Sequence, residues 1–103
     1  MTKTYFITYD LHAPNQNYEG IRDAIFRAAD NGCISFWQSS YLISSSCESA
    51  NKVMEFLQEE IDADDKVIIF EVTANFNFAT NLSKADDKKI FDLMFDWQAL
   101  YAH

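Results

Sequence analysis

The sequence has few residues that interrupt regular structure and few that carry positive charge. Its 103 residues include one proline, two glycines and two cysteines. Eight Lys and Arg residues stand against sixteen Asp and Glu residues, which gives a formal net charge of -8 at pH 7. A protein of this sign is poorly suited to coat a phosphate backbone unaided. The scarcity of basic residues therefore disfavours a generic nucleic-acid coat protein.

The two cysteines, Cys33 and Cys47, do not have the spacing of a metal-chelating pair. The chain also lacks a signal-peptide pattern and any long apolar run. We therefore expect a cytoplasmic protein with reduced thiols and no membrane contact. Free cysteines often behave as small buried apolar residues, and we expect that role here.

What the chain does contain is ample material for a core, because 49% of its residues are hydrophobic and 16% are aromatic. A chain of this length buries about two thirds of its unfolded surface as one domain. We expect a single domain over residues 1–103, with a core over 3–79 and an added helix over 83–101.

Residues 3–11 have the alternation of a central strand. Tyr5, Ile7, Tyr9 and Leu11 are apolar or aromatic, whereas the intervening positions are mixed. Asp10 comes at the end of this strand, before a loop that contains the only proline. Open sheets usually carry their chemistry at the carboxyl ends of strands, so Asp10 is a candidate site residue.

The next segments alternate between helical and extended patterns. A three-and-four spacing of apolar residues predicts a helix from about 17 or 18 to about 30. Residues 33–39 and 40–45 predict two strands joined by a turn around 38–40, although one bent strand would also fit. The spacing of Ser45 and Glu48 is that of a capping box, which would open a second helix. Its apolar stripe comprises Ala50, Val53, Met54, Leu57 and Ile61.

The last third of the chain begins with a solvated acidic turn over residues 62–65. Residues 66 to about 78 alternate as a long strand, with apolar residues at the even positions from Ile68 to Phe78. The strand is either continuous or broken near Asn75. Ser83 is placed to cap a helix from Lys84 to about Tyr101. Apolar side chains cover more than half of the circumference of that helix, so we expect it to form a homodimer contact.

The predicted order of elements is strand, helix, strand, strand, helix, strand, followed by a helix. Two right-handed crossovers then give an α+β fold, the ferredoxin-like βαββαβ sandwich, with both crossover helices on one face of an antiparallel sheet. Phe6, Thr8 and Asp10 would point to the other face. A face-to-face dimer or the last helix would have to cover Phe6.

Two short motifs resemble a known family. Tyr5 to Asp10, reading Tyr-Phe-Ile-Thr-Tyr-Asp, is similar to the first strand of the CRISPR-associated Cas-two endonucleases. Phe36 to Ile43, reading Phe-Trp-Gln-Ser-Ser-Tyr-Leu-Ile, resembles the second motif of that family and a pattern in the virulence-associated protein D ribonucleases. The resemblance spans residues 4 to 74 and includes the order of elements.

The resemblance implies a ferredoxin-like homodimer and, in catalytic members, a metal-dependent endoribonuclease or deoxyribonuclease. The strand-end aspartates of two subunits would then bind Mg²⁺, which activates water against a phosphodiester. Carried over to this chain, the site would comprise Asp10 as metal ligand, Tyr9 beside it, and Ser39 or Ser40. The chain departs from the family pattern because no basic residue follows Asp10 before Arg22, and because its C-terminal segment is predicted to be helical.

Each candidate residue also has a structural interpretation. Asp10 is either a metal ligand or an acceptor for N–H groups of the adjoining loop. His12 is either an acid, base or metal ligand, or a loop residue. Trp37 and Trp97 either stack on bases or pack in a core or interface.

Three functions from different classes fit these patterns. The first is a Cas-two-like, metal-dependent nuclease acting on RNA or DNA. The second is a non-catalytic dimeric module that binds a protein partner. The third is an acidic nucleic-acid mimic that inhibits a nucleic-acid-binding protein. The net charge favours the last two, whereas Asp10 and its motif neighbours favour the first.

Overall fold

The computed structural model describes residues 2–11, 18–73, 79, 81–90 and 93, and for residues 36 and 37 it describes the backbone alone. Four strands, two longer helices and a short 3-10 turn form most of this part. Their order is β1 (Lys3–Asp10), α1 (Tyr18–Ala28), β2 (Gly32–Trp37), β3 (Ser40–Ser45), α2 (Ala50–Leu57), η1 (Gln58–Glu60) and β4 (Lys66–Val72). Residues 84–90 form a further helix.

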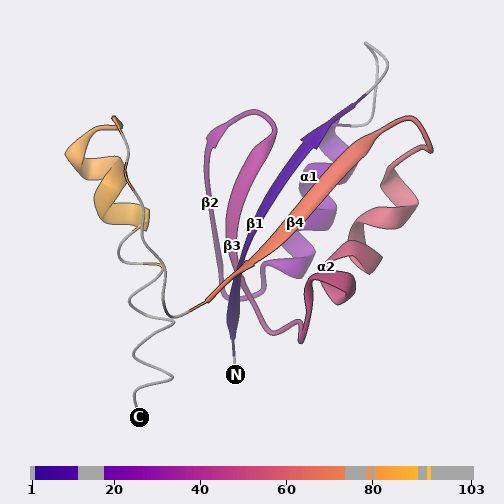
Figure 1. Cartoon of the computed structure of the whole chain (residues 1–103), viewed down its shortest axis with the longest axis horizontal. Coiled ribbons are helices and arrows are strands. Elements are labelled where there is room, and N and C mark those ends of the chain that lie inside the picture. Colours follow the sequence, from indigo (N-terminus) through magenta and orange to yellow (C-terminus); the bar gives the residue numbers. More distant parts are fainter. Residues whose placement is uncertain (1, 12–17, 74–78, 80, 91–92, 94–103) are drawn as a thin grey trace.

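The strands form one antiparallel sheet in the order β2-β3-β1-β4. Strand β1 is therefore central, as predicted from its sequence. Helices α1 and α2 lie side by side on one face of the sheet (Figure 1). The α+β class predicted from the sequence is confirmed. We call the face of the sheet opposite α1 and α2 the open face.

The alternation predicted for β1 is confirmed by burial. Tyr5 and Ile7 are fully buried, and Tyr9 and Leu11 are nearly so. Phe6 and Thr8 are half-buried on the open face, and Asp10 is exposed. The odd positions of β1 thus belong to the core beneath the helices, because successive side chains of a strand point to opposite faces.

The stripe predicted for α1 was Tyr18, Ile21, Ile25 and Ala28. The helix buries the last three together with Ala24, and Tyr18 is partly buried against the same core. The helix ends at Ala28, two residues earlier than predicted. Beyond it the chain pairs with β3, because the backbone N–H of Asn31 donates to the carbonyl oxygen of Ser44 at 3.1 Å and not to the helix. Two side chains add to this connection. Asp30 accepts hydrogen bonds from the backbone N–H and the hydroxyl of Ser46, and Asn31 Nδ2 donates to Ser44 Oγ at 2.8 Å.

Residues 32–45 form two strands, so the alternative of one bent strand is wrong. Strands β2 and β3 pair as a hairpin, with an irregular register between Ile34 and Trp37. The backbone N–H of Tyr9 donates to the carbonyl oxygen of Ser39 at 3.0 Å. The turn is therefore fixed by β1 and does not depend on a glycine or asparagine.

The prediction that Ser45 caps the second helix is wrong. Ser49 occupies the N-cap position of α2, where its Oγ accepts from the backbone N–H of Lys52 at 3.3 Å. Ser45 is buried at the end of β3, paired with Lys3 of β1. Its Oγ accepts from the backbone N–H of Cys47 at 3.0 Å. Pairing with the central strand thus extends β3 through the residue that the local pattern assigned to a cap.

The core-facing stripe predicted for α2 is confirmed except at Met54, which is half-buried and does not belong to the core cluster. Val53 and Leu57 are fully buried, and Ala50 and Ile61 pack against the same core. Ile61 lies beyond the helix, because α2 ends at Leu57 and continues as the 3-10 turn η1.

Strand β4 ends at Val72, earlier than predicted, and the predicted continuation over residues 74–78 lies outside the described residues. Val67 and Ile69 pack against the core beneath the helices. The predicted even-numbered apolar positions therefore face the other way, onto the open face.

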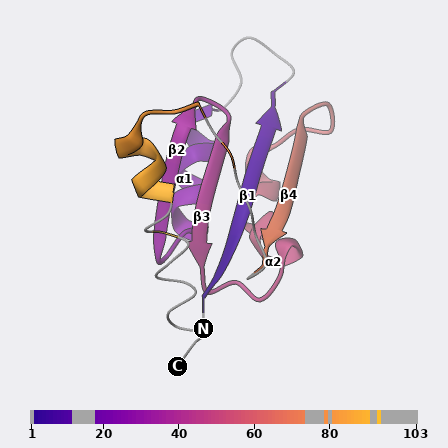
Figure 2. The same ribbon diagram turned by 60° about the vertical axis from the view of Figure 1, so that its left-hand side comes forward.

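The C-terminal helix begins as predicted. Ser83 caps it, because Ser83 Oγ accepts from the backbone N–H of Asp86 at 3.1 Å. This helix lies on the side of the sheet opposite α1 and α2, beside β2 (Figures 1 and 2). A Cβ atom on Gly32 would lie 3.0 Å from Leu93 Cδ1, so Leu93 approaches the backbone of β2 closely. Ile90, the first residue of the apolar surface predicted to form a dimer contact, is half-buried, and the remainder of that surface, including Trp97, lies outside the described residues.

Candidate functional site

Strand pairing arranges the side chains of the open face in four rows that run across the sheet. The first row contains Gly32, Ser44, Thr4 and Val72, and the second contains Ile34, Leu42, Phe6 and Phe70. The third contains Ser40, Thr8 and Ile68, and the fourth contains Asp10 and Lys66. The face is thus apolar in its second row and polar or charged toward the end of β1.

The second row, together with Ile68, forms what we call the apolar strip. Its exposure increases toward β4. Ile34, Leu42 and Phe6 are half-buried, whereas Phe70 is 57% exposed and Ile68 is 52% exposed. Phe70 lies opposite Phe6 in the register of β1 and β4. The first row is different, because Thr4 and Ser44 are fully buried.

Asp10 ends the central strand on the rim of the open face. Its side chain is exposed, and it pairs in register with Lys66. Thr8, two residues earlier on the same face, lies 3.1 Å from Ser40, Oγ1 to Oγ. Within the described ranges, no three His, Cys, Asp or Glu side chains come together as a metal would require. His12 and His103 lie outside those ranges.

Tyr9, in contrast, lies on the helix side of the sheet. Its ring stacks on that of Tyr41, with centroids 6.3 Å apart. Its hydroxyl donates to the carbonyl oxygen of Gln38 at 3.1 Å. Burial, with Tyr41 as the next largest cause, raises the pKa of Tyr9 well above its ordinary value, so the phenol is neutral at physiological pH. Tyr9 therefore holds the hairpin against the core and does not share a face with Asp10.

The two candidate serines are placed differently from each other. Ser40 shares the open face with Thr8 and Asp10, and its carbonyl oxygen accepts from Ser35 Oγ at 2.8 Å. Ser39 lies in the turn and contributes its carbonyl oxygen to the backbone N–H of Tyr9. The structure thus brings Asp10 and Ser40 to one face but directs Tyr9 to the other. The side chain of Trp37, the other candidate in this motif, lies outside the described part of the chain.

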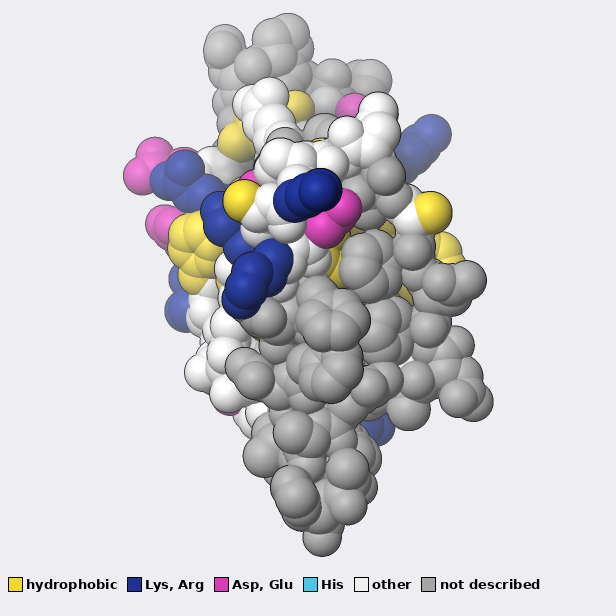
Figure 3. Space-filling model, turned by 90° about the vertical axis from the view of Figure 1, so that its left-hand side faces the viewer, with side chains coloured by type: hydrophobic (Ala, Val, Ile, Leu, Met, Phe, Trp, Pro, Cys, Tyr) yellow, Lys and Arg dark blue, Asp and Glu magenta, His cyan; other side chains and the backbone are white. Residues whose placement is uncertain are grey.

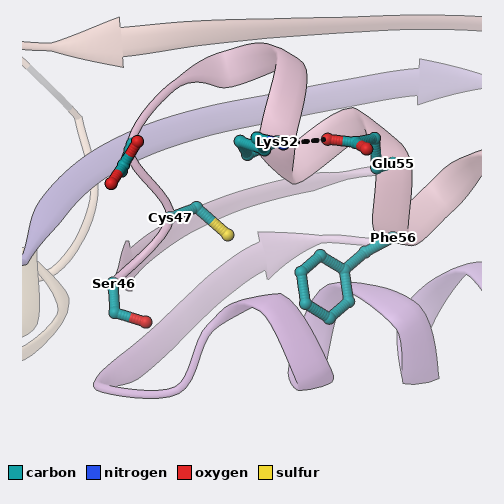
Figure 4. Close-up of a pocket in the computed structure, with 6 residues that line it drawn as sticks. Ser46, Cys47, Lys52, Glu55 and Phe56 are labelled. Carbon is teal, nitrogen blue, oxygen red and sulfur yellow. Dashed lines mark ion pairs between the residues drawn. The ribbon is translucent and has the colours of Figure 1, made fainter.

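A shallow hollow of about 440 Å³ lies at the start of α2, away from these residues. It is lined by Ser46, Cys47, Glu48, Lys52, Glu55 and Phe56 (Figure 4). Lys52 and Glu55 form an ion pair of 3.3 Å beside it, which satisfies both charges locally. The carbonyl oxygen of Cys47 accepts from the hydroxyl of Tyr5 at 2.7 Å.

Both cysteines are free and half-buried. Desolvation by burial raises the pKa of Cys33 to about 11. A thiol with a raised pKa is mostly protonated near neutral pH and reacts slowly. This environment agrees with the apolar role expected for Cys33 and gives it no catalytic character.

Charged side chains do not form a field of one sign on the side of the molecule that carries the C-terminal helix. Among the described residues on that side of the molecule, basic and acidic side chains are interspersed (Figure 3). Lys89 and Asp86 lie 3.8 Å apart on that helix.

Sequence reasoning placed Asp10 and Phe6 on the open face but missed the contribution of β4. The sequence contained this information, because Ile68 and Phe70 are among the even-numbered apolar positions of residues 66–78. It was ambiguous because Val67 and Ile69 are apolar too, so only the register with β1 shows which pair is exposed.

The described residues contain no helix that is both long enough and apolar enough to cross a bilayer. No known protein-family model matches the chain, and no curated protein is significantly similar to it.

Proposed function

We propose that this chain is a Cas-two-like protein of ferredoxin-like fold that acts as a dimeric protein-interaction module, with the open face as its binding surface. The strand order β2-β3-β1-β4, with α1 and α2 on one face, supports the ferredoxin-like assignment. The observation that carries the functional proposal is the apolar strip.

A single exposed apolar side chain needs no explanation, but a contiguous group does. Phe70 and Ile68 are more than half exposed, and they adjoin Phe6 in the next strand. All three lie on a rigid sheet, which holds them in place at little entropic cost on binding. A partner protein that covers this strip removes apolar surface from water, which is the main favourable term in association.

The surroundings of the strip indicate the chemistry of the contact. Its neighbours toward the end of β1 are the hydroxyls of Thr8 and Ser40, followed by Asp10 and Lys66. An apolar centre with a polar rim is the usual anatomy of a specific protein interface. We therefore expect binding to change little with salt, whereas a nucleic-acid mimic would lose affinity steeply as salt rises.

The experiment that tests this proposal places a photo-crosslinking phenylalanine analogue at position 70 and, as a control, at position 26. Phe26 is 50% exposed but lies on α1, on the far side of the sheet. We expect a discrete partner to crosslink at 70 and not at 26. The purified partner must then bind the native chain, with weak dependence on salt, and must lose about tenfold or more in affinity for Phe70→Glu but not for Phe26→Glu. Equal crosslinking at both positions, or unchanged binding by Phe70→Glu, would overturn the proposal.

A metal-dependent nuclease is the second candidate, and the exposed position of Asp10 beside Thr8 and Ser40 favours it. In such an enzyme the Asp10 carboxylates of two subunits would hold Mg²⁺, which lowers the pKa of bound water. The test is cleavage of labelled single-stranded RNA and double-stranded DNA with Mg²⁺ or Mn²⁺, by wild type and Asp10→Asn. Metal-dependent cleavage that is lost in Asp10→Asn would replace the interaction module by a nuclease. Absence of cleavage over a range of pH and salt would support the module.

A further inference from the structure

The two edges of the sheet differ in how well they are protected. At the β2 edge the register is irregular between Ile34 and Trp37, and Leu93 lies over the adjoining part of the open face, close to Gly32. Irregularities and covering segments are common devices that prevent edge-to-edge pairing. The β4 edge has neither device among the described residues. Strand β4 pairs with β1 without interruption from Lys66 to Val72 (Figure 2).

The composition of β4 makes this edge a strong template for pairing. Its seven residues read KVIIFEV, with no proline or glycine and with charges only at Lys66 and Glu71. An unpaired edge leaves a row of backbone N–H and C=O groups available to another strand. Within the described part of the chain, no strand pairs with the outer edge of β4.

We propose that two copies of the chain join through their β4 edges, antiparallel and symmetric about Ile69. A two-fold axis perpendicular to the sheet produces such an isologous contact and keeps the open faces on the same side. In this register Ile68 lies opposite the partner's Phe70, and Lys66 lies opposite the partner's Val72. The occupant of the edge is thus a second copy, selected by the self-complementarity of β4.

This register is favoured over its neighbours for two reasons. It overlaps all seven residues of β4, whereas a symmetric register centred on Ile68 or Phe70 overlaps fewer. It also places Lys66 and Glu71 opposite valines, so no like charges face each other directly. Cross-strand apolar pairs stabilise a sheet, and like charges directly opposite destabilise it.

The pairing has a consequence for the open face. It joins the apolar strips of the two copies into one continuous surface, because Ile68 and Phe70 are the exposed ends of each strip. It also separates the two Asp10 carboxylates. Asp10 is in register with Lys66. In the proposed dimer the two Lys66 residues lie at opposite ends of the paired strands, six residue steps apart. Six steps correspond to about 20 Å along the strands. The two carboxylates therefore do not share a metal in this dimer.

The test is site-specific disulfide formation in a background in which Cys33→Ala and Cys47→Ala remove the native thiols. One chain carries Ile68→Cys and the other Phe70→Cys. We expect mild oxidation of the mixture to yield several-fold more linked dimer than oxidation of either chain alone, because Cβ atoms directly opposite are closer than diagonal ones. Phe26→Cys, at an equally exposed position on α1, serves as the control and should yield no linked dimer.

The mass of the unmodified wild-type chain in solution, from light scattering over a concentration series, completes the test. An edge contact of this size is at the small end of specific interfaces, so we expect a dimer that dissociates on dilution. A monomer at all concentrations, or equal linking by the Phe26→Cys, Ile68→Cys and Phe70→Cys variants, would overturn the edge pairing. Neither result depends on the binding of another protein. A crosslink from position 70 to a second copy of the chain would report the edge contact, whereas a crosslink to a different protein would report binding at the open face.

Discussion

Phe6 of β1 lies directly opposite Phe70 of β4, on the face of the sheet that α1 and α2 leave uncovered. Phe6 is half-buried and Phe70 is 57% exposed. Phe70 is thus the solvent-exposed member of the pair, and Phe6 is the partly buried one. It is the centre of the apolar strip and the basis of the interaction proposed for this chain.

Replacing Phe70 should affect binding far more than folding. We expect Phe70→Ser to lower the free energy of unfolding by less than about 1 kcal/mol, since it removes one cross-strand pair on an exposed surface. Ile7→Ala, at a fully buried position of β1, should cost about 2–5 kcal/mol. Urea denaturation of both variants measures the difference, under conditions in which the chain is monomeric. A comparable loss in both would show that Phe70 is buried in the native protein.

The position of the α2 cap is testable with one serine. Ser49→Ala should lower the free energy of unfolding by about 1 kcal/mol, because the N–H of Lys52 loses the hydroxyl of Ser49 as an acceptor and keeps only the carbonyl oxygen of that residue. Ser49→Asp should retain most of the stability, since aspartate accepts the same hydrogen bond and favours a helix N-terminus. Thermal and urea unfolding provide the comparison. If Ser49→Ala is neutral, the cap lies elsewhere.

Burial of Cys33 predicts a loss of stability in alkaline solution. Its pKa is about 11 in the folded protein, against an ordinary value of 9.0. Both states carry a neutral thiol below pH 9, so the contribution of Cys33 is fully present there. Between pH 9 and 11 the unfolded state ionises first, and stability falls. Cys33→Ala should make unfolding less sensitive to pH in this range.

The control for this prediction uses the other cysteine, because tyrosines also ionise in alkaline solution. Cys47→Ala should leave the pH dependence contributed by Cys33 in place. Thiol-reagent kinetics at pH 8 provide an independent measurement, in which Cys33 should react more slowly than a fully exposed cysteine. Rapid reaction of Cys33 at that pH would contradict the burial that raises its pKa.

Asp10 should contribute little to stability, whatever its function. Its side chain is exposed, and surface substitutions of this kind usually change the free energy of unfolding by no more than about 0.5 kcal/mol. We expect Asp10→Asn and wild type to unfold at the same urea concentration. A loss of more than about 1 kcal/mol would instead indicate that the carboxylate accepts hydrogen bonds from the adjoining loop.

The sequence alone was sufficient for the elements whose apolar periodicity is regular. The stripe of α1 and the alternation of β1 determined which of their side chains enter the core, because each pattern matches one period of backbone geometry. Ser83 was also found from its local pattern, since a cap forms with residues three positions away. These features depend on interactions near in sequence.

Tertiary structure decided the features that depend on residues distant in sequence. Ser45 pairs with Lys3 and so belongs to β3, which moves the cap of α2 to Ser49. Near the centre of β4, odd-numbered and even-numbered residues alike are apolar. Only the register of β4 with β1 shows that Val67 and Ile69 face the core, whereas Ile68 and Phe70 lie on the open face. Tyr9 and Asp10, adjacent in the motif, are separated by the sheet itself. The sequence thus determined the elements by local periodicity, whereas strand pairing between distant segments determined which side chains share a surface.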